Sequence, residues 1–362
     1  MKKETGKQVA KRDNKPLSGN LIVDIQKLIE TARQNVAVTV NTRLTLLYWQ
    51  IGGRIRQDIL EEKRADYGKE IVATLSAKLA NDFGNNFNEK NLRRMIQFAE
   101  VFPDKQIVVS LIRQLSWTHF IALIPLKNDL QRDFYAEMCR VERWSVRTLR
   151  KKIDGMLYER TAISKKPEEL VKKELSALRD EDRITPDLVF RDPYFLDFLG
   201  LKDTYSEKDL EAAILREMES FILELGVGFS FVARQKRITV DSDDYYLDLL
   251  FFHRKLKRLI AIELKLGKFK AAYKGQMELY LRWLEKYEKE PGEETPLGLI
   301  LCAGKTSQQI ELLQLDKSGI KVAEYMTELP KRKLLEQKLH KAVEMARKQL
   351  EASPANGNTG NR

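Results

Sequence analysis

Residues 245–265 read YYLDLLFFHRKLKRLIAIELK, and this stretch decides the fold of the second half of the 362-residue chain. Two apolar runs flank the polar HRKLK segment, which is the pattern of a β-hairpin. A turn centred between Lys255 and Leu256 makes the numbers of facing residues sum to 511. Asp248 then lies opposite Glu263, and Lys265 lies opposite Tyr246.

This hairpin predicts a cluster of three charged side chains. Directly opposed side chains project to one face, with Cβ atoms roughly 4.5–5.5 Å apart, and residues i and i+2 of a strand share a face. Lys265 therefore joins Asp248 and Glu263. Burial of these charges in apolar strands is costly without a partner, and a divalent cation would be such a partner. We expect a metal site for hydrolysis here.

A solvated salt bridge on the open face of an antiparallel sheet is the alternative interpretation. The residues around the three charges are apolar on both faces of the two runs: Leu247, Leu249, Leu250, Phe251, Phe252, Ile260, Ala261, Ile262 and Leu264. This pattern is typical of a central strand that is covered on both sides and has no solvated face. We therefore favour the functional interpretation.

Composition bounds the class of protein. The length favours two domains, and 43% hydrophobic with 32% charged residues is typical of a globular chain. The two cysteines, Cys139 and Cys302, are far apart in apolar contexts and predict a reduced chain without a disulfide framework. The three histidines are scattered, which gives no sign of a zinc cluster. The basic start is not followed by an apolar segment, and no run approaches the ~18 apolar residues of a membrane span. We expect a cytoplasmic protein with no membrane partner.

Positive charge is concentrated in the first half of the chain. Residues 1–160 contain 29 Lys and Arg against 19 Asp and Glu, and the remainder contains 35 against 34. Nearly all of the net charge of +11 therefore comes from the first half, as expected for a segment that contacts a polyanion. The alternative is a basic face that only solvates the protein. Beside a hydrolytic metal site, nucleic acid is the favoured partner.

The first half has the periodicity of an all-helical domain at 21–160, preceded by a polar, basic arm at 1–20 that we expect to be disordered. Helices are expected near 21–29, 44–55, 71–79, 92–102, 118–126, 132–141 and 146–157. A turn at 83–86, with Asn88 as a helix N-cap, predicts a helix–turn–helix element. Its second helix carries Lys90, Arg93 and Arg94 for contact with nucleic acid. The pattern alone favours a plain helical hairpin in a bundle over a DNA-reading element.

The second half changes character. Residues 161–183 are charged and weakly patterned and predict a linker formed by a solvated helix. From 184 to 330 the order of elements is αβββαβ, with a helix at 207–225 that Gly226 ends. Strands follow at 229–240, in the two runs of the hairpin, at 297–303 and at 320–325. A basic helix and a disordered tail are expected at 331–362. The predicted class is α + α/β.

That order, with Asp248 on the second strand and Glu263-Leu264-Lys265 on the third, resembles the PD-(D/E)XK nuclease superfamily. Further segments resemble a YhcG-like two-domain family: VNTRLTLLYWQIG, LSAKLANDFG, NLRRMIQFAEVFP, LSWTHF, WSVRTLRKKI, LYER, FILELGVGFSFVARQ and IELKLGKFKAAYKGQMELYLRWL. The resemblance covers about residues 21–330. It implies a mixed-sheet, restriction-endonuclease-like domain and a bacterial metal-dependent endonuclease that acts on DNA.

The chemistry assigns roles to the hairpin residues. Phosphodiester hydrolysis needs a hydroxide nucleophile and neutralisation of the phosphate charge. Mg²⁺ serves both needs and prefers carboxylate and carbonyl oxygens, with Mn²⁺ as a substitute. Asp248 and Glu263 supply carboxylates, and the superfamily pattern adds the carbonyl of Leu264. Lys265 would position or deprotonate the attacking water, because burial and a nearby metal lower the pKa of a lysine.

The resemblance also implies residues outside the hairpin. A glutamate on the preceding helix completes the metal shell in this pattern, and Glu211 occupies that place, with Glu217 and Glu219 ranked lower. Gln276 and Tyr280, at i and i+4 on the following helix, match family positions that contact phosphate or orient the lysine.

Three further residues are expected to face nucleic acid: Gln235 on the first strand, and Lys268 and Lys270 just past the motif. The sequence departs from the superfamily pattern at Leu247, where a proline is usual, but that proline is not a ligand.

We therefore expect an Mg²⁺-dependent nuclease, with a homodimer if both strands of a duplex are cut. The alternative is a catalytically silent nucleic-acid-binding or restriction-accessory protein on the same fold. A second alternative is a subunit whose N-terminal half binds a protein partner.

Overall fold

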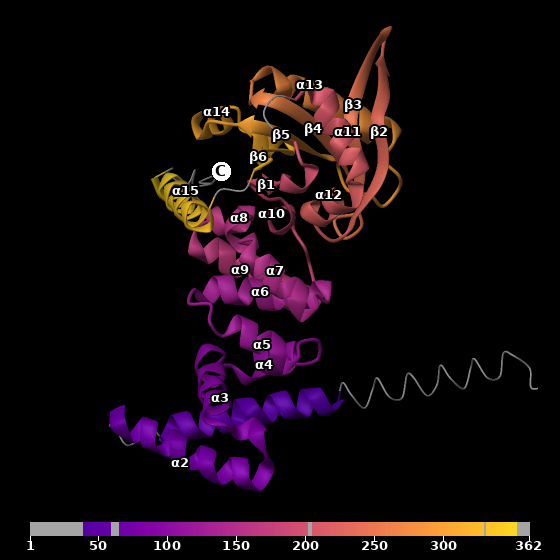
Figure 1. The fold of residues 1–362 in the computed structure, drawn as a ribbon. Coiled ribbons are helices and arrows are strands. Elements are labelled where there is room, and N and C mark those ends of the chain that lie inside the picture. Colours follow the sequence, from indigo (N-terminus) through magenta and orange to yellow (C-terminus); the bar gives the residue numbers. More distant parts are fainter. Residues whose placement is uncertain (1–38, 59–64, 202–204, 329–330, 353–362) are drawn as a thin grey trace, which may run out of the picture. The chain divides into compact units, whose positions relative to one another are not determined.

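The computed structural model describes residues 39–58, 65–201, 205–328 and 331–352 (Figure 1). The chain divides into two compact units, Met1–Ile124 and Pro125–Arg362. The predicted arm at 1–20, the predicted helix at 21–29 and the predicted tail from residue 353 lie outside the described residues. None of the described helices combines the length and apolar character needed to cross a membrane.

The described part of the first unit is helical, as predicted. Residues 39–58 form a helix. The elements that follow are α2 (Ala65–Phe83), the 3₁₀ turn η1 (Asn85–Phe87), α3 (Glu89–Val101), α4 (Lys105–Leu111) and α5 (Trp117–Leu123). The predicted helix–turn–helix is present as α2, η1 and α3, and the Asn88 side chain accepts a hydrogen bond from the Asn91 amide at 3.0 Å. Helix α4 was not among the predicted helices, because its β-branched Ile-Val-Val run obscures the helical pattern.

Close backbone contact holds the helix at 39–58 against α3. An added Cβ at Gly52 would lie 1.8 Å from the Met95 carbonyl oxygen, whereas the nearest atom to a Cβ at Gly53 would be 3.9 Å away, on Ala99. Tyr48, Ile55, Val72, Leu92 and Met95 are buried around this contact. Only glycine therefore fits at position 52.

We expect Gly52→Ala to destabilise the first unit by roughly 1–3 kcal/mol, because the methyl group must push two helices apart. Gly53→Ala is the matched control and should stabilise slightly or change little, since alanine has the better helix propensity. Thermal unfolding followed by circular dichroism compares the two variants. Equal unfolding midpoints would contradict the close packing of these helices.

The second unit begins with helices and continues into a sheet. Its helical elements before the sheet are α6 (Asp129–Glu142), α7 (Val146–Asp154), α8 (Leu157–Arg160), η2 (Ala162–Lys165), α9 (Glu168–Glu181) and α10 (Pro186–Val189). The remaining elements are β1 (Tyr194–Phe195), η3 (Asp197–Leu199), α11 (Glu207–Arg216), α12 (Met218–Leu225), β2 (Phe229–Val240), β3 (Asp243–His253), β4 (Arg258–Lys268), α13 (Ala272–Tyr287), β5 (Leu297–Gly304), α14 (Ser307–Leu312), η4 (Leu315–Ser318), β6 (Ile320–Met326) and α15 (Arg332–Ala352).

The predicted linker at 161–183 is packed. Helix α9 buries Val171, Leu175 and Leu178. Its Arg179 Nε donates to Glu137 Oε1 of α6 at 2.8 Å, and Glu137 is buried. A helix is present here as expected, but one face of it belongs to a core. The compact units also divide at residue 124, earlier than the predicted boundary at 160.

The sheet is mixed, as predicted, with strand order β1-β6-β5-β4-β3-β2. Strands β2, β3 and β4 pair antiparallel, while β4, β5, β6 and β1 pair parallel. The hairpin register is confirmed: Leu249 faces Ile262 and His253 faces Arg258, so the facing numbers sum to 511. Strand β6 confirms the strand expected at 320–325, and β1 is a further strand at the parallel edge that the sequence did not predict.

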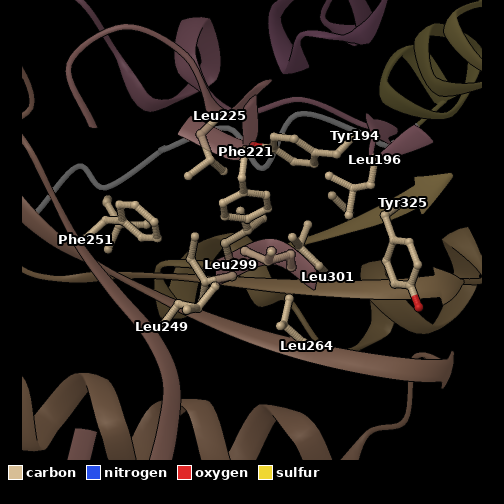
Figure 2. Close-up of a cluster of buried hydrophobic side chains, with 14 of the residues drawn as sticks. Tyr194, Leu196, Phe221, Leu225, Leu249, Phe251, Leu264, Leu299, Leu301 and Tyr325 are labelled. Carbon is tan, nitrogen blue, oxygen red and sulfur yellow. The ribbon is translucent and has the colours of Figure 1, made fainter. Parts of the chain in front are cut away.

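Both faces of β4 are covered, which confirms that it is a central strand. On one face Ile262 and Leu264 pack with Phe221 of α12 and Leu299 of β5 (Figure 2). On the other face Ala261 packs in a second cluster with Met277 of α13. No open apolar face of β4 is left to solvent.

The helix predicted at 207–225 is two helices, and this corrects the prediction. Glu217 breaks the helical conformation with φ −104° and ψ 32°, and α12 begins at Met218. Gly226 ends α12 as predicted, with a φ of 128° that favours glycine.

Candidate active site

The hairpin ladder opens where its acidic residues lie. The pairing of β3 with β4 reaches Leu249 and Ile262. Beyond this pair the Leu264 amide donates to Asp248 Oδ2 at 2.8 Å, and the Asp248 amide donates to Glu263 Oε1 at 3.3 Å. Each acidic side chain therefore accepts a hydrogen bond from the backbone of the opposite strand. This exchange holds the two carboxyl groups next to each other.

Lys265 completes the predicted cluster. Its Nζ lies 2.9 Å from Glu263 Oε2, and the two side chains are 14% and 4% exposed. The same ammonium lies 5.3 Å from the centre of the Tyr273 ring of α13. The structure thus brings Asp248, Glu263 and Lys265 together, as the register predicts.

Burial and mutual repulsion disfavour negative charge in this cluster. Burial, and then the Asp248 carboxylate, raise the pKa of Glu263 to about 7. Burial is also the main cause of a raised pKa at Asp248. The carboxylate forms of both groups are therefore disfavoured, and a bound cation would stabilise them.

The pKa of Lys265 is raised in the protein without a metal. Burial lowers this pKa, as expected from the sequence, but the adjacent Glu263 carboxylate outweighs burial and the net direction is upward. The neighbouring negative charge stabilises the ammonium form. Lys265 is therefore protonated near neutral pH in the protein without a metal.

Glu211 reaches the cluster through Gln235. The Gln235 amide nitrogen donates to Glu211 Oε2 at 3.0 Å and to Asp248 Oδ1 at 3.1 Å. Burial and then Asp248 raise the pKa of Glu211. The lower-ranked Glu217 lies 4.0 Å from Arg216 at the helix break, and Glu219 is exposed on α12. Of the three helix-borne candidates, Glu211 is the one that shares a hydrogen-bond partner with Asp248.

Gln235 has an unusual backbone for a strand residue. Its φ is 43°, in the left-handed region that residues other than glycine rarely adopt. Such a conformation costs of order 1–3 kcal/mol and persists where the surroundings require it. The paired residues on either side of it are Arg234 with Leu249 and Lys236 with Leu247. The distortion accompanies a side chain that contacts two acidic groups, which the sequence pattern does not reveal.

Glu207 is a member of the site that sequence reasoning missed. This first residue of α11 accepts a hydrogen bond from the Leu266 amide at 3.3 Å. Its negative charge contributes to the raised pKa values of Asp248 and Lys265, after larger causes. The sequence did contain a sign of where α11 begins, because Ser206 and Asp209 form a capping box, which makes Glu207 the first residue of the helix.

Gln276 and Tyr280 occupy one side of α13, as their spacing predicts. Gln276 Nε2 donates to the Tyr280 hydroxyl at 2.7 Å, and that hydroxyl donates to the Tyr246 carbonyl at 3.3 Å. Burial is the main cause of a raised pKa at Tyr280, and the charges of Glu263 and Asp248 add to it. The pair therefore lies within electrostatic reach of the acidic cluster, bonded to β3 rather than to Lys265.

The other predicted contacts with nucleic acid lie on exposed surfaces. Lys268 and Lys270 are exposed at the end of β4 and just after it. On α3 of the first unit Lys90 is exposed, Arg93 pairs with Glu89 at 2.6 Å, and Arg94 donates to Asn91 Oδ1 at 3.3 Å.

The donor set fits a hard cation of Mg²⁺ type. Asp248, Glu263 and Glu211 offer carboxylate oxygens, and Leu264 offers a carbonyl oxygen. Within the described ranges, no group of three or more His, Cys, Asp or Glu side chains is placed to hold a metal ion. Mg²⁺ keeps several waters and commonly binds through one or two carboxylates, and the pair Asp248 and Glu263 is compatible with that mode of binding.

Comparison with known proteins places both halves of the chain. Residues 24–160 match a family model described as the DUF1016 N-terminal domain, and residues 187–340 match one described as the YhcG PDDEXK nuclease domain. Over 343 residues the chain is 34% identical to the "Putative nuclease YhcG" of Escherichia coli (strain K12). This match covers 86% of this chain and 91% of that protein.

Two solved structures are similar to part of the chain. A repair endonuclease from Pyrococcus abyssi shares 22% identity, with a TM-score of 0.25, over 36% of this chain and 50% of its own. A complex of EndoMS with double-stranded DNA shares 19% identity, with a TM-score of 0.27, over 36% and 48%.

Proposed function

Because the chain belongs to the YhcG family, with its DUF1016 N-terminal domain and YhcG PDDEXK nuclease domain, we propose that it is a metal-dependent endonuclease that hydrolyses phosphodiester bonds in DNA. The observation that carries this proposal is the meeting of Asp248, Glu263 and Lys265 where the β3–β4 ladder opens. A purely structural ion pair would not need a second, repelling carboxylate beside it.

Asp248, Glu263 and the Leu264 carbonyl would hold Mg²⁺, with Glu211 as a further ligand. The bound ion would supply an acidified water at neutral pH and neutralise charge on the phosphate. Glu263 would bind the ion as a carboxylate, so its proton would be released to solvent on binding. Gln235 holds Glu211 and Asp248 within reach of the same point.

Lys265 orients the attacking water or the phosphate oxygen through its ammonium hydrogens. Its raised pKa depends on the charge of Glu263. A cation that shared that charge would weaken the main stabilisation of the ammonium and would lower its pKa. Lys265 can then exchange a proton during the reaction. Tyr280 and Gln276 support the phosphate side of the site from α13.

The first unit would hold the substrate. Its part of the chain carries most of the excess positive charge, and the α3 residues Lys90 and Arg93, which are exposed, and Arg94, which is half-buried, are of the type that contacts phosphates. Substituting the three together should reduce the salt dependence of DNA binding, because each released counterion contributes to that slope. A protein-binding role for this unit would leave the slope unchanged.

The experiment that tests the function is a cleavage panel. Purified protein is incubated with linear, branched and modified DNA, and with RNA, in the presence of Mg²⁺, Mn²⁺ or EDTA. We expect cleavage of DNA with either metal and none with EDTA. Binding of DNA without cleavage under any metal would instead favour the catalytically silent alternative.

Metal binding should depend on pH through Glu263. Its pKa of about 7 without metal means that a cation must displace a proton at pH 6 but not at pH 8. We expect the apparent affinity for Mn²⁺ to be about tenfold weaker at pH 6, since one proton competes for one ligand. Isothermal titration calorimetry at the two values measures this difference. Glu263→Gln should bind Mn²⁺ more weakly and lose the pH dependence, whereas an unchanged wild-type affinity would contradict the assignment of Glu263.

A further inference from the structure

Strands β2 and β3 continue as a two-stranded arm beyond the rest of the sheet. Strand β3 pairs with β4 from Leu249 to His253, but it pairs with β2 as far as Asp243. Residues 236–247, here called the arm, therefore have no third strand beside them. Figure 1 shows the β2–β3 pair projecting past the other strands. The arm begins next to Asp248, so it extends directly from the acidic cluster.

One face of the arm is packed against α13. Ile238 and Leu247 are buried in the cluster around Met277 and Tyr280. Lys236 adds an ion pair to Glu288 at 2.7 Å. These contacts anchor the arm on a helix, so that its position beside the site is fixed.

The other face presents a cationic and an aromatic side chain as a pair. Arg237 lies directly opposite Tyr246, and their side chains are 63% and 51% exposed. Tyr246 is two residues from Asp248 along β3. The pair therefore lies about 7 Å along the strand from the acidic cluster.

We propose that Arg237 and Tyr246 bind the substrate strand beside the bond that is cut, an inference that rests on the proposed nuclease function. The Arg237 guanidinium contacts a phosphate, which it can hold through two parallel hydrogen bonds. The Tyr246 ring stacks on a base or sugar, a contact that tolerates any sequence. The ligand is a single nucleic-acid strand in extended form.

The charges around the pair limit the length of this binding surface. Asp244 pairs with Arg237 at 2.7 Å on the open surface, and such exposed ion pairs are weak enough for a phosphate to replace. Asp241 and Asp243 lie farther out, at the tip, where they repel a polyanion. The strand therefore contacts the inner part of the arm, next to the acidic cluster, and turns away before the tip.

The test measures binding of a fluorescent single-stranded DNA oligonucleotide by anisotropy in EDTA. Tyr246→Leu keeps an apolar side chain of similar bulk but removes the aromatic face, and should weaken binding roughly 5- to 100-fold. Tyr246→Phe should restore binding to near the wild-type value. Arg237→Ala should weaken binding and reduce the slope of log affinity against log salt by about one. Arg216→Ala, an exposed arginine on α11, is the matched control and should bind like wild type.

Circular dichroism melting checks that each variant is folded. Wild-type affinity in Tyr246→Leu, an equal loss in Tyr246→Phe, or no DNA binding by the wild type would overturn the inference. If the wild type cleaves DNA while Tyr246→Leu and Arg237→Ala bind normally, the arm has no binding role and the nuclease function stands. If the variants lose binding and the wild type never cleaves, Arg237 and Tyr246 do bind nucleic acid but the proposed nuclease function is wrong.

Discussion

Asp248→Asn is expected to reduce DNA cleavage by about 10³-fold or more. The substitution removes one negative charge from the proposed metal site and keeps the shape of the side chain. Neutralisation of phosphate charge by a metal supplies several kcal/mol, and every 1.36 kcal/mol is a factor of ten in rate. Lys265→Ala should cause a loss of similar order, because the reacting water is no longer oriented.

The folded state should tolerate Asp248→Asn. An asparagine oxygen can still accept the hydrogen bond from the Leu264 amide, and burial already raises the pKa of Asp248, which means that the charged form is disfavoured. Thermal stability without metal should therefore be equal or higher. Initial cleavage rates with Mg²⁺, measured alongside melting curves, separate this result from unfolding.

Glu219→Gln serves as the control for this experiment. Glu219 is an exposed acidic residue on α12 and was a lower-ranked alternative for the metal shell. Its substitution should leave the cleavage rate unchanged. Wild-type cleavage by Asp248→Asn would remove the basis of the mechanism.

Glu224→Ala is expected to destabilise the second unit by about 3–5 kcal/mol. Glu224, on α12, accepts hydrogen bonds from Arg160, from Arg191 and from the Phe195 amide at 2.8 Å. Arg160 and Arg191 are only 3% and 6% exposed. Removal of one partner from a buried pair leaves an uncompensated charge, which accounts for the large cost.

The measurement is the midpoint of thermal unfolding, where a loss of this size in a unit of this length corresponds to roughly 10 °C. Glu219→Ala on the same helix is the matched control and should shift the midpoint little, since the residue is exposed. Glu224→Gln should fall between the two, because its amide oxygen can still accept one bond. Equal midpoints for Glu224→Ala and Glu219→Ala would show that the arginines find other partners.

Local sequence is enough to predict the centre of the fold. The alternation of apolar and charged residues from Tyr245 to Lys265 determines the hairpin register, because a slip of one residue would turn every apolar side chain to the wrong face. That register by itself places Asp248, Glu263 and Lys265 side by side on one face of the hairpin.

The parts that were not predicted depend on tertiary contacts. The charged segment at 161–183 has few apolar residues, yet α9 is held by Arg179 and Glu137, a pairing that no local pattern contains. The left-handed backbone of Gln235 accompanies its contacts with Glu211 and Asp248, and the raised pKa of Lys265 is caused by Glu263. These residues meet only in the folded chain.

The buried arginines set a lower limit on the smallest piece of this chain that can fold alone. A fragment trimmed to the nuclease-domain match at 187–340 would retain the acidic cluster but lose Arg160, the partner of Glu224. It would also lose α6 and α9, which stabilise each other through Glu137 and Arg179. Anyone preparing the catalytic half in isolation should therefore start near Pro125, where the second compact unit begins.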